Sequence, residues 1–152
     1  MRFDGKTIVV TGGALGIGEA ASRLLAERGS QVSIVDWDDE AGNATCAAIE
    51  KGGGRAIFTK ADVSERTAGE KAIAMTIETF GGIDGLIVSA GNQRYGTALT
   101  TSDDQWDEVL GVNLKGAWNA ARAVIPHLQR AGKGSIVNVS SVQALASQQN
   151  VL

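Results

Sequence analysis

The sequence predicts an α/β fold in which a doubly wound parallel sheet carries helices on both faces. Two observations support this prediction. Short apolar runs rich in β-branched residues alternate with longer segments of helical periodicity, which is typical of parallel strands joined by right-handed crossovers. The chain has 152 residues, of which 43% are hydrophobic and 20% charged. This size and composition suit one globular domain over residues 1–152.

The first half of the chain contains three predicted strands and two predicted helices. The run TIVVT over residues 7–11 predicts a buried strand because it is short and β-branched. The helix expected over residues 18–29 ends at Gly29, and one of its faces carries Ala21, Leu24 and Leu25. The elements that follow are a strand over residues 31–36, a glycine-terminated helix over 39–54 and a strand over 55–63.

The second half continues the alternation with two helices and two strands. Ile73, Ile77 and Phe80 are spaced for one helix face, which predicts a helix over residues 65–82. The remaining elements are a strand over 83–91, one long helix over 102–132 and a fifth strand over 134–141. A stripe of the long helix steps by three or four residues and is expected to face the sheet. It consists of Trp106, Leu110, Asn113, Ala117, Ala121, Val124 and Leu128.

A cluster of glycines lies between the first strand and the first helix. The pattern is T-G-x-x-x-G-x-G, from Thr11 through Gly12 and Gly16 to Gly18. In a doubly wound sheet, this junction borders the crevice in which nucleotides bind. Glycine lets the backbone approach a pyrophosphate, and the helix N-terminus offers N–H groups and a positive dipole end. The pattern therefore predicts a pyrophosphate-binding loop, with a merely flexible loop as the alternative.

Asp36 ends the second predicted strand, 18 residues after Gly18. A carboxylate at this point can accept both hydroxyls of an adenosine ribose and would repel a 2′-phosphate. Ala14, Leu15 and Trp37 supply no cation that a 2′-phosphate would need. The expected cofactor is therefore NAD rather than NADP. The alternative for Asp36 is that it caps the helix predicted over residues 39–54.

Asp62 and Val63 end the third predicted strand in a similar way. The Asp62 carboxylate is placed to meet the amino group of an adenine ring. Capping of the helix that follows is a competing role for the same side chain.

Several classes of protein are excluded by composition. The net charge of −3 and the pI of about 5.1 argue against a nucleic-acid or anionic-membrane partner. Cys46 is the single cysteine and His127 the single histidine, so neither an internal disulfide nor a metal cluster is expected. The first residues do not resemble a secretory signal, and no run approaches the roughly 20 apolar residues of a membrane span. A cytoplasmic protein is the default expectation.

Taken in order, these motifs resemble those of the short-chain dehydrogenase/reductase family. The resemblance covers the chain from Gly5 to Leu152. It rests on the glycine motif, Asp36, Asp62-Val63, the SAG sequence over residues 89–91, Asn113 and the GSIVNVSS sequence over residues 134–141. It implies a Rossmann-type sheet with strand order 3-2-1-4-5, in which the last strands of the family fold are missing from this chain.

The resemblance also implies roles for individual residues. Asn113 looks like the helix asparagine that holds a water of the proton relay, with a structural asparagine as the alternative. Ser141 looks like the serine that hydrogen-bonds the reacting oxygen, with a turn hydroxyl as the alternative. The residues expected to bind the cofactor are Gly12, Leu15, Gly16, Ile17, Gly18, Asp36, Trp37, Asp62, Val63, Ser89, Ala90 and Gly91.

The chain departs from the family pattern at two points. Ser89 stands where the family usually has asparagine, which puts a side-chain tie between the central strands in doubt. The family's Tyr-x-x-x-Lys pair is absent, because the only tyrosine is Tyr95 and Leu99 follows four residues later. Tyr95 is more typical of a substrate-loop residue, with packing in a glycine-rich loop as its alternative. The 152-residue chain alone is therefore expected to be inactive.

The resulting hypothesis is an NAD-dependent oxidoreductase that interconverts an alcohol and a carbonyl by hydride transfer. Its full-length form is expected to be a homodimer or homotetramer with a small-molecule substrate. A non-catalytic NAD-binding module or sensor is the alternative, supported by the missing Tyr-x-x-x-Lys pair. A third possibility is a scaffold that joins oligomers through the long helix, in which Trp106 and Trp118 would matter most.

Overall fold

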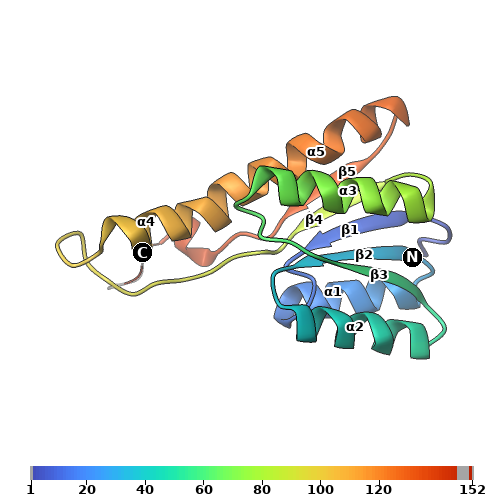
Figure 1. Ribbon diagram of the computed structural model, residues 1–152, viewed down its shortest axis with the longest axis horizontal. Coiled ribbons are helices and arrows are strands. Elements are labelled where there is room, and N and C mark those ends of the chain that lie inside the picture. Colours follow the sequence, from blue (N-terminus) through green and yellow to red (C-terminus); the bar gives the residue numbers. More distant parts are fainter. Residues whose placement is uncertain (1, 147–150, 152) are drawn as a thin grey trace.

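A five-stranded parallel sheet forms the centre of the computed structural model, which describes residues 2–146 and 151. The strands are ordered β3-β2-β1-β4-β5 (Figure 1), which confirms the predicted fold class and strand order. Their bounds are Thr7–Thr11 for β1, Gln31–Asp36 for β2, Arg55–Lys60 for β3, Gly85–Val88 for β4 and Ser135–Asn138 for β5. Because β1 is central, its carboxyl end lies between those of β2 and β4.

Helices cover both faces of the sheet (Figure 1). Helices α1 (Gly16–Glu27) and α2 (Asp39–Lys51) pack on one face. Helices α3 (Arg66–Phe80) and α5 (Ala117–Arg130) pack on the other. The remaining helical segments are α4 (Asp103–Leu110), the π-helix η1 (Gly111–Gly116) and the short 3₁₀ helix η2 (Val142–Ala144).

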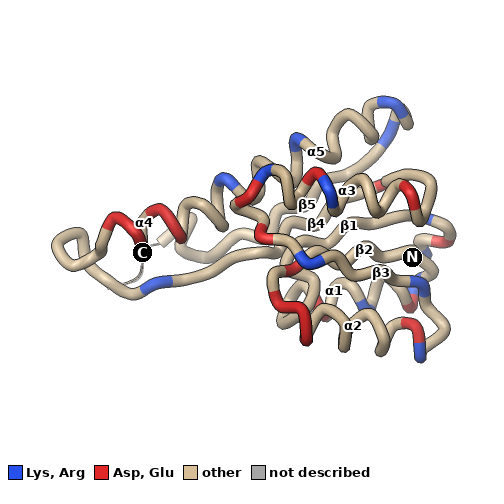
Figure 2. Tube along the Cα trace, in the orientation of Figure 1, with Lys and Arg blue, Asp and Glu red and all other residues tan. Residues whose placement is uncertain are grey.

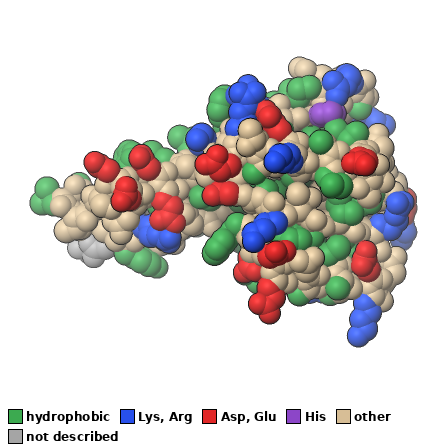
Figure 3. Space-filling model, in the orientation of Figure 1, with side chains coloured by type: hydrophobic (Ala, Val, Ile, Leu, Met, Phe, Trp, Pro, Cys, Tyr) green, Lys and Arg blue, Asp and Glu red, His purple; other side chains and the backbone are tan. Residues whose placement is uncertain are grey.

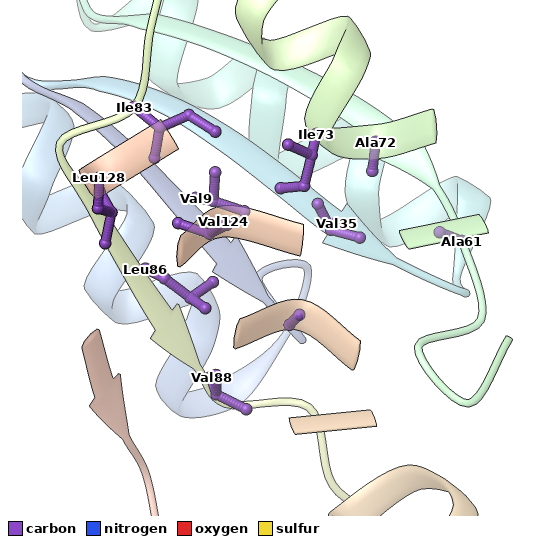
Figure 4. Packing of buried hydrophobic residues seen from close by; sticks show 11 residues of the cluster. Val9, Val35, Ala61, Ala72, Ile73, Ile83, Leu86, Val88, Val124 and Leu128 are labelled. Carbon is purple, nitrogen blue, oxygen red and sulfur yellow. The ribbon is translucent and has the colours of Figure 1, made fainter. Parts of the chain in front are cut away.

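The core is divided by the sheet into two apolar layers. Successive residues of a strand point to opposite faces, so Val9 and Val10 of β1, each fully buried, belong to different layers. Figure 4 shows the layer under α3 and α5, in which Val9 and Val35 of the sheet face Ile73 and Val124 of the helices. The strands are therefore apolar on both sides, as expected for a parallel sheet covered by helices.

The face of α1 differs from the prediction. Its buried residues are Gly18, Ser22 and Ala26, whereas the Leu24 side chain is 52% exposed. Small side chains let the helix lie close to the sheet, and that close packing turns Leu24 away from it. The face that carries Ala21, Leu24 and Leu25 is therefore only partly covered: Ala21 and Leu25 are half-buried and Leu24 is exposed.

The predicted helix over residues 102–132 is continuous but not uniform. It begins with a capping box between Ser102 and Gln105 and changes to π-helical hydrogen bonding at η1 before it continues as α5. A π-turn adds a residue to the helical repeat, so one stripe cannot keep facing the same way across it. Figure 1 also shows that α4 projects beyond the sheet.

The inward stripe is therefore correct only in its second half. Val124 and Leu128 are buried as predicted, but Trp106 is 52% exposed and Asn113 is exposed. The prediction that Asn113 faces the sheet was wrong, because this part of the helix extends past the sheet edge (Figure 1).

We call α4, η1 and the first turn of α5 the helical arm. Hydrophobic side chains are exposed along it. Leu114 of η1 is 67% exposed and Trp118 of α5 is 56% exposed, with the Arg122 guanidinium 4.6 Å from the centre of the Trp118 ring. Figure 3 shows hydrophobic side chains along one edge of the arm and acidic side chains beside them. Among the residues that the structure describes, no helix is both long and apolar enough to span a membrane.

Candidate functional site

A cleft of about 550 Å³ lies at the carboxyl ends of the strands. This is the edge at which doubly wound folds bind their ligands. Nine of the predicted cofactor-binding residues line it, namely Gly12, Leu15, Asp36, Trp37, Asp62, Val63, Ser89, Ala90 and Gly91. Residues from the loops after β1, β2, β3 and β4, distant in sequence, thus share one surface.

The glycine loop has a backbone that other residues would disturb. Gly12 has φ +66°, and a Cβ at Gly12 would lie 2.5 Å from the Ala90 amide nitrogen. A Cβ at Gly18 would lie 1.9 Å from the Gly12 carbonyl oxygen. The loop therefore packs backbone against backbone, which only glycine allows at these two positions.

The third glycine of the motif faces open space. Gly16 has φ +58°, and a Cβ there would meet no atom within 4 Å. Gly16 begins α1, and the preceding Leu15 provides no side-chain cap for the first amide groups. The Leu15 and Ile17 side chains are 58% and 67% exposed. An uncapped helix start beside open space is suited to an anion such as a pyrophosphate.

Asp36 lies at the floor of the cleft and holds the glycine loop. Its side chain is 8% exposed; Oδ2 accepts the Ala14 amide at 3.0 Å and Oδ1 accepts the Asp38 amide at 3.2 Å. The cap of α2 is Asp38, whose side chain accepts the Ala41 amide at 3.0 Å. The alternative role of Asp36 as the cap of α2 is therefore excluded.

Thr45 of α2 holds the same loop from the other side. Its Oγ1 donates to the Ala14 carbonyl at 3.0 Å, and the residue is 2% exposed. Thr45 was not predicted from the sequence, although a threonine on the inner face of an amphipathic helix is a signal for a buried hydrogen bond. The peptide groups on both sides of Ala14 are thus anchored, one by Asp36 and the other by Thr45.

Asp62 lies in a tight turn at the wall of the cleft. Its Oδ1 accepts the Ser64 amide at 2.8 Å and the Ser64 hydroxyl at 2.7 Å. The residue that precedes α3 is Glu65, so Asp62 is not the cap of that helix. The competing role was therefore wrong, and the carboxylate remains exposed beside the cleft.

Asn113 of η1 reaches the loop that follows β4. Its Oδ1 accepts the Asn92 amide and its Nδ2 donates to the Asn92 carbonyl, both at 2.9 Å. Asn92 lines the cleft, whereas Asn113 does not. The alternative of a structural asparagine matches this geometry, and Asn113 acts on the cleft through the backbone of Asn92.

The far end of the cleft carries Asn92 and Arg94, from the 92–101 segment expected to line the substrate pocket, together with Glu108, which was not predicted. Arg94 Nε donates to Glu108 Oε2 at 2.9 Å, and Asn92 Nδ2 donates to Glu108 Oε1 at 3.2 Å. These three residues all line the cleft. Arg94 neutralises Glu108, but Asp107 also lines this end of the cleft, so its net charge is negative.

Ser141 and Tyr95 lie outside the cleft lining. Ser141 is exposed, and its Oγ accepts the Gln143 amide at 3.2 Å at the start of η2. This geometry is that of the turn hydroxyl. Tyr95 is 72% exposed and Leu99 96% exposed, in agreement with a loop position for the tyrosine.

Two residues with reactive side chains also lie outside the cleft. Burial, with a smaller contribution from Glu50, raises the pKa of the Cys46 thiol, so the reactive thiolate is disfavoured. Burial also lowers the pKa of His127, and the guanidinium of Arg130, which donates to His127 Nδ1 at 2.6 Å, lowers it further. His127 therefore lies in the last turn of α5, outside the cleft.

Comparison with known proteins identifies the family. A family model described as short chain dehydrogenase matches residues 6–151. The chain is 40% identical to meso-2,3-butanediol dehydrogenase of Serratia marcescens, covering 95% of this chain and 57% of the relative. It is 43% identical to the short-chain reductase protein NovJ of Streptomyces niveus, covering 90% of this chain and 52% of the relative.

A solved structure agrees with this assignment. The crystal structure of gox2181 superposes with a TM-score of 0.95 at 28% identity, over 99% of this chain and 59% of that one. The chain therefore spans little more than half the length of the relatives it matches. Matched over nearly all of its residues, the chain belongs to the short-chain dehydrogenase family.

Proposed function

We propose that the protein is an NAD-dependent oxidoreductase that interconverts an alcohol and a carbonyl compound by hydride transfer. The observation that carries this proposal is the buried Asp36 carboxylate. It lines the cleft and, at the same time, holds the glycine loop by accepting the Ala14 amide. Short-chain dehydrogenases use nicotinamide cofactors, and the relative from Serratia is named as a dehydrogenase of a diol. A secondary alcohol or its ketone is the substrate class that fits.

The residues present fit a dinucleotide. Backbone contact between Gly12 and Gly18 leaves the start of α1 without a covering side chain, and the space at Gly16 is open. We propose that the pyrophosphate lies there, against the first amide groups of α1. Leu15 and Ile17 would flank it, and the adenosine would extend toward Asp36 and Asp62.

The charges around Asp36 favour NAD over NADP. Asp38, Asp39 and Glu40 follow it after Trp37, and Figure 2 shows this acidic group at the start of α2. Lys60, which the sequence analysis did not consider, pairs with Asp36 in the strand register, but its ammonium lies 3.7 Å from the Asp39 carboxylate. A ribose 2′-phosphate would therefore meet an excess of negative charge.

The remaining residues are assigned roles by proposal. The bound nicotinamide supplies the acceptor or donor of hydride. Ser89, Ala90 and Gly91 would border the nicotinamide ribose, while Asn113 would support proton delivery through the Asn92 loop. Ser141 would orient the reacting oxygen. We also propose one dinucleotide-binding domain, a homodimeric or homotetrameric whole protein and a cytoplasmic location.

Variants of Asp36 test the choice of cofactor. Asp36→Asn keeps an oxygen for the Ala14 amide but removes the charge, so NAD affinity should fall about tenfold, as for loss of a charged hydrogen bond, while NADP affinity rises. Asp36→Ala also releases the glycine loop and should weaken both cofactors. Dissociation constants from calorimetry provide the measurement. NADP binding as tight as NAD binding in the unaltered protein would contradict the proposal.

One observation favours the alternative of a non-catalytic NAD-binding module. Within residues 1–152 there is no Tyr-x-x-x-Lys pair, and Tyr95 and Leu99 are both exposed. A module of this kind would bind NAD with the same preference over NADP and give no turnover. The activity measurement in the Discussion separates it from a dehydrogenase.

A further inference from the structure

Asn119 of α5 is a buried polar residue that no part of the site described above uses. It is 3% exposed, and its Nδ2 donates to the Val63 carbonyl at 3.1 Å and to the Ser64 carbonyl at 3.2 Å. A buried amide is costly unless it is hydrogen-bonded. Its side chain therefore clamps the backbone of a segment that lies far away in the sequence.

The clamped segment also packs closely on the same helical arm. Val63 is 9% exposed, and a Cβ added at Gly116 would lie 2.7 Å from Val63 Cγ2. Gly116 ends η1, three residues before Asn119. One close apolar contact and one pair of hydrogen bonds thus fix residues 62–64 against the helix.

Residues 62–64 form a wall of the cleft, whereas Asn119 does not line it. The Asp62 carboxylate is oriented within this segment by the Ser64 amide and hydroxyl. Movement of the Val63 and Ser64 carbonyls would therefore move the Asp62 carboxylate relative to the rest of the cleft. Asn119 can change ligand recognition without touching the ligand.

We propose that Asn119 is a positioning residue for adenine recognition. It holds residues 62–64 so that the Asp62 carboxylate can accept a hydrogen bond from the amino group of the ring. This inference rests on the proposed function, because it assumes a dinucleotide in the cleft. The helical arm would then help to select the base, in addition to holding the Asn92 backbone through Asn113.

The test uses a dinucleotide whose base differs from adenine at C6 and, through the N1–H of its lactam form, at N1. Nicotinamide hypoxanthine dinucleotide carries a carbonyl oxygen where NAD carries the adenine amino group. The natural protein should bind NAD about tenfold more tightly than this analogue, the effect expected of one hydrogen bond to the charged Asp62 carboxylate. Asn119→Leu, similar in size but without donors, should reduce that preference to about twofold or less.

Two further variants separate positioning from general loss of stability. Thr76→Val removes a fully buried hydroxyl that lies away from the cleft. This hydroxyl bonds to Ser33 Oγ at 2.7 Å and donates to the Ala72 carbonyl at 2.8 Å. It should keep the full preference for NAD. Gly116→Ala should lower the preference by pushing Val63, which provides an independent test if Asn119→Leu does not fold.

The outcomes are distinguishable. Loss of preference in Asn119→Leu or Gly116→Ala, with preference retained in Thr76→Val, supports the inference. Full preference in folded Asn119→Leu and Gly116→Ala overturns it while the proposed function stands. Failure of the natural protein to bind NAD overturns the proposed function, and this inference falls with it.

Discussion

Gly16→Val is expected to weaken NAD binding about a hundredfold, the effect of losing two backbone hydrogen bonds to a charged phosphate. The Gly16 backbone has φ +58° and faces open space at the start of α1. A valine there would strain the backbone and place its methyl groups where we propose the pyrophosphate lies. Calorimetric titration with NAD provides the measurement, and circular dichroism should show most of the helix content retained.

Gly53 offers a matched control for Gly16. It has φ +82°, also has no atom within 4 Å of an added Cβ, and lies outside the cleft. Gly53→Val should lower the free energy of unfolding by a similar amount, about 1–2 kcal/mol, and leave NAD affinity unchanged. Equal affinity in Gly16→Val and the natural sequence would show that the loop does not bind the pyrophosphate.

Gly12→Val should remove NAD binding, at a greater cost to the fold than Gly16→Val. Its Cβ would press on the backbone at Ala90, at the exit of β4, as well as strain a φ of +66°. The Gly16 variant is therefore the cleaner test of binding. A Gly12→Val protein that folds and keeps its NAD affinity would contradict the assignment of the loop.

Residues 1–152 expressed alone are expected to show no useful dehydrogenase turnover. Hydride leaves a carbinol carbon only as the proton leaves the adjacent oxygen. Ser141 lies outside the cleft lining, and its Oγ accepts the Gln143 amide rather than bonding to a base. Asn113 cannot act as a base, and Tyr95 has Leu99 where the family's pair would have a lysine. Loss of a general acid–base group typically costs roughly a hundred- to ten-thousand-fold in rate.

The measurement is NADH absorbance over a panel of secondary alcohols and diols, with the Serratia relative as a positive control. NAD binding is measured on the same sample, so that absence of turnover is not confused with absence of cofactor. Turnover by residues 1–152 that matches the control would refute the roles assigned to Ser141 and Asn113. Binding with no turnover in the whole natural protein would support the non-catalytic module.

Local sequence pattern was sufficient for the fold and for most of the residues that the structure gathers at the cleft. Alternation of short β-branched runs with helical periodicity predicts a parallel sheet, and the position of the glycine motif follows from its place between β1 and α1. Asp36 could be placed near the glycine motif because the carboxyl end of β2 lies beside that of β1 in such a sheet. These features depend on neighbours in sequence and on the general geometry of the fold.

The tertiary structure decided what depends on contacts between distant segments. Periodicity assumes a uniform helix, so it could not locate the π-turn at η1 or show that Asn113 is exposed and bonds to the Asn92 backbone. Nor could it show that Asn119 clamps residues 62–64 or that Thr45 anchors the glycine loop. A buried polar side chain forms its hydrogen bonds with whichever backbone group the packing brings near. The local sequence pattern does not specify that partner.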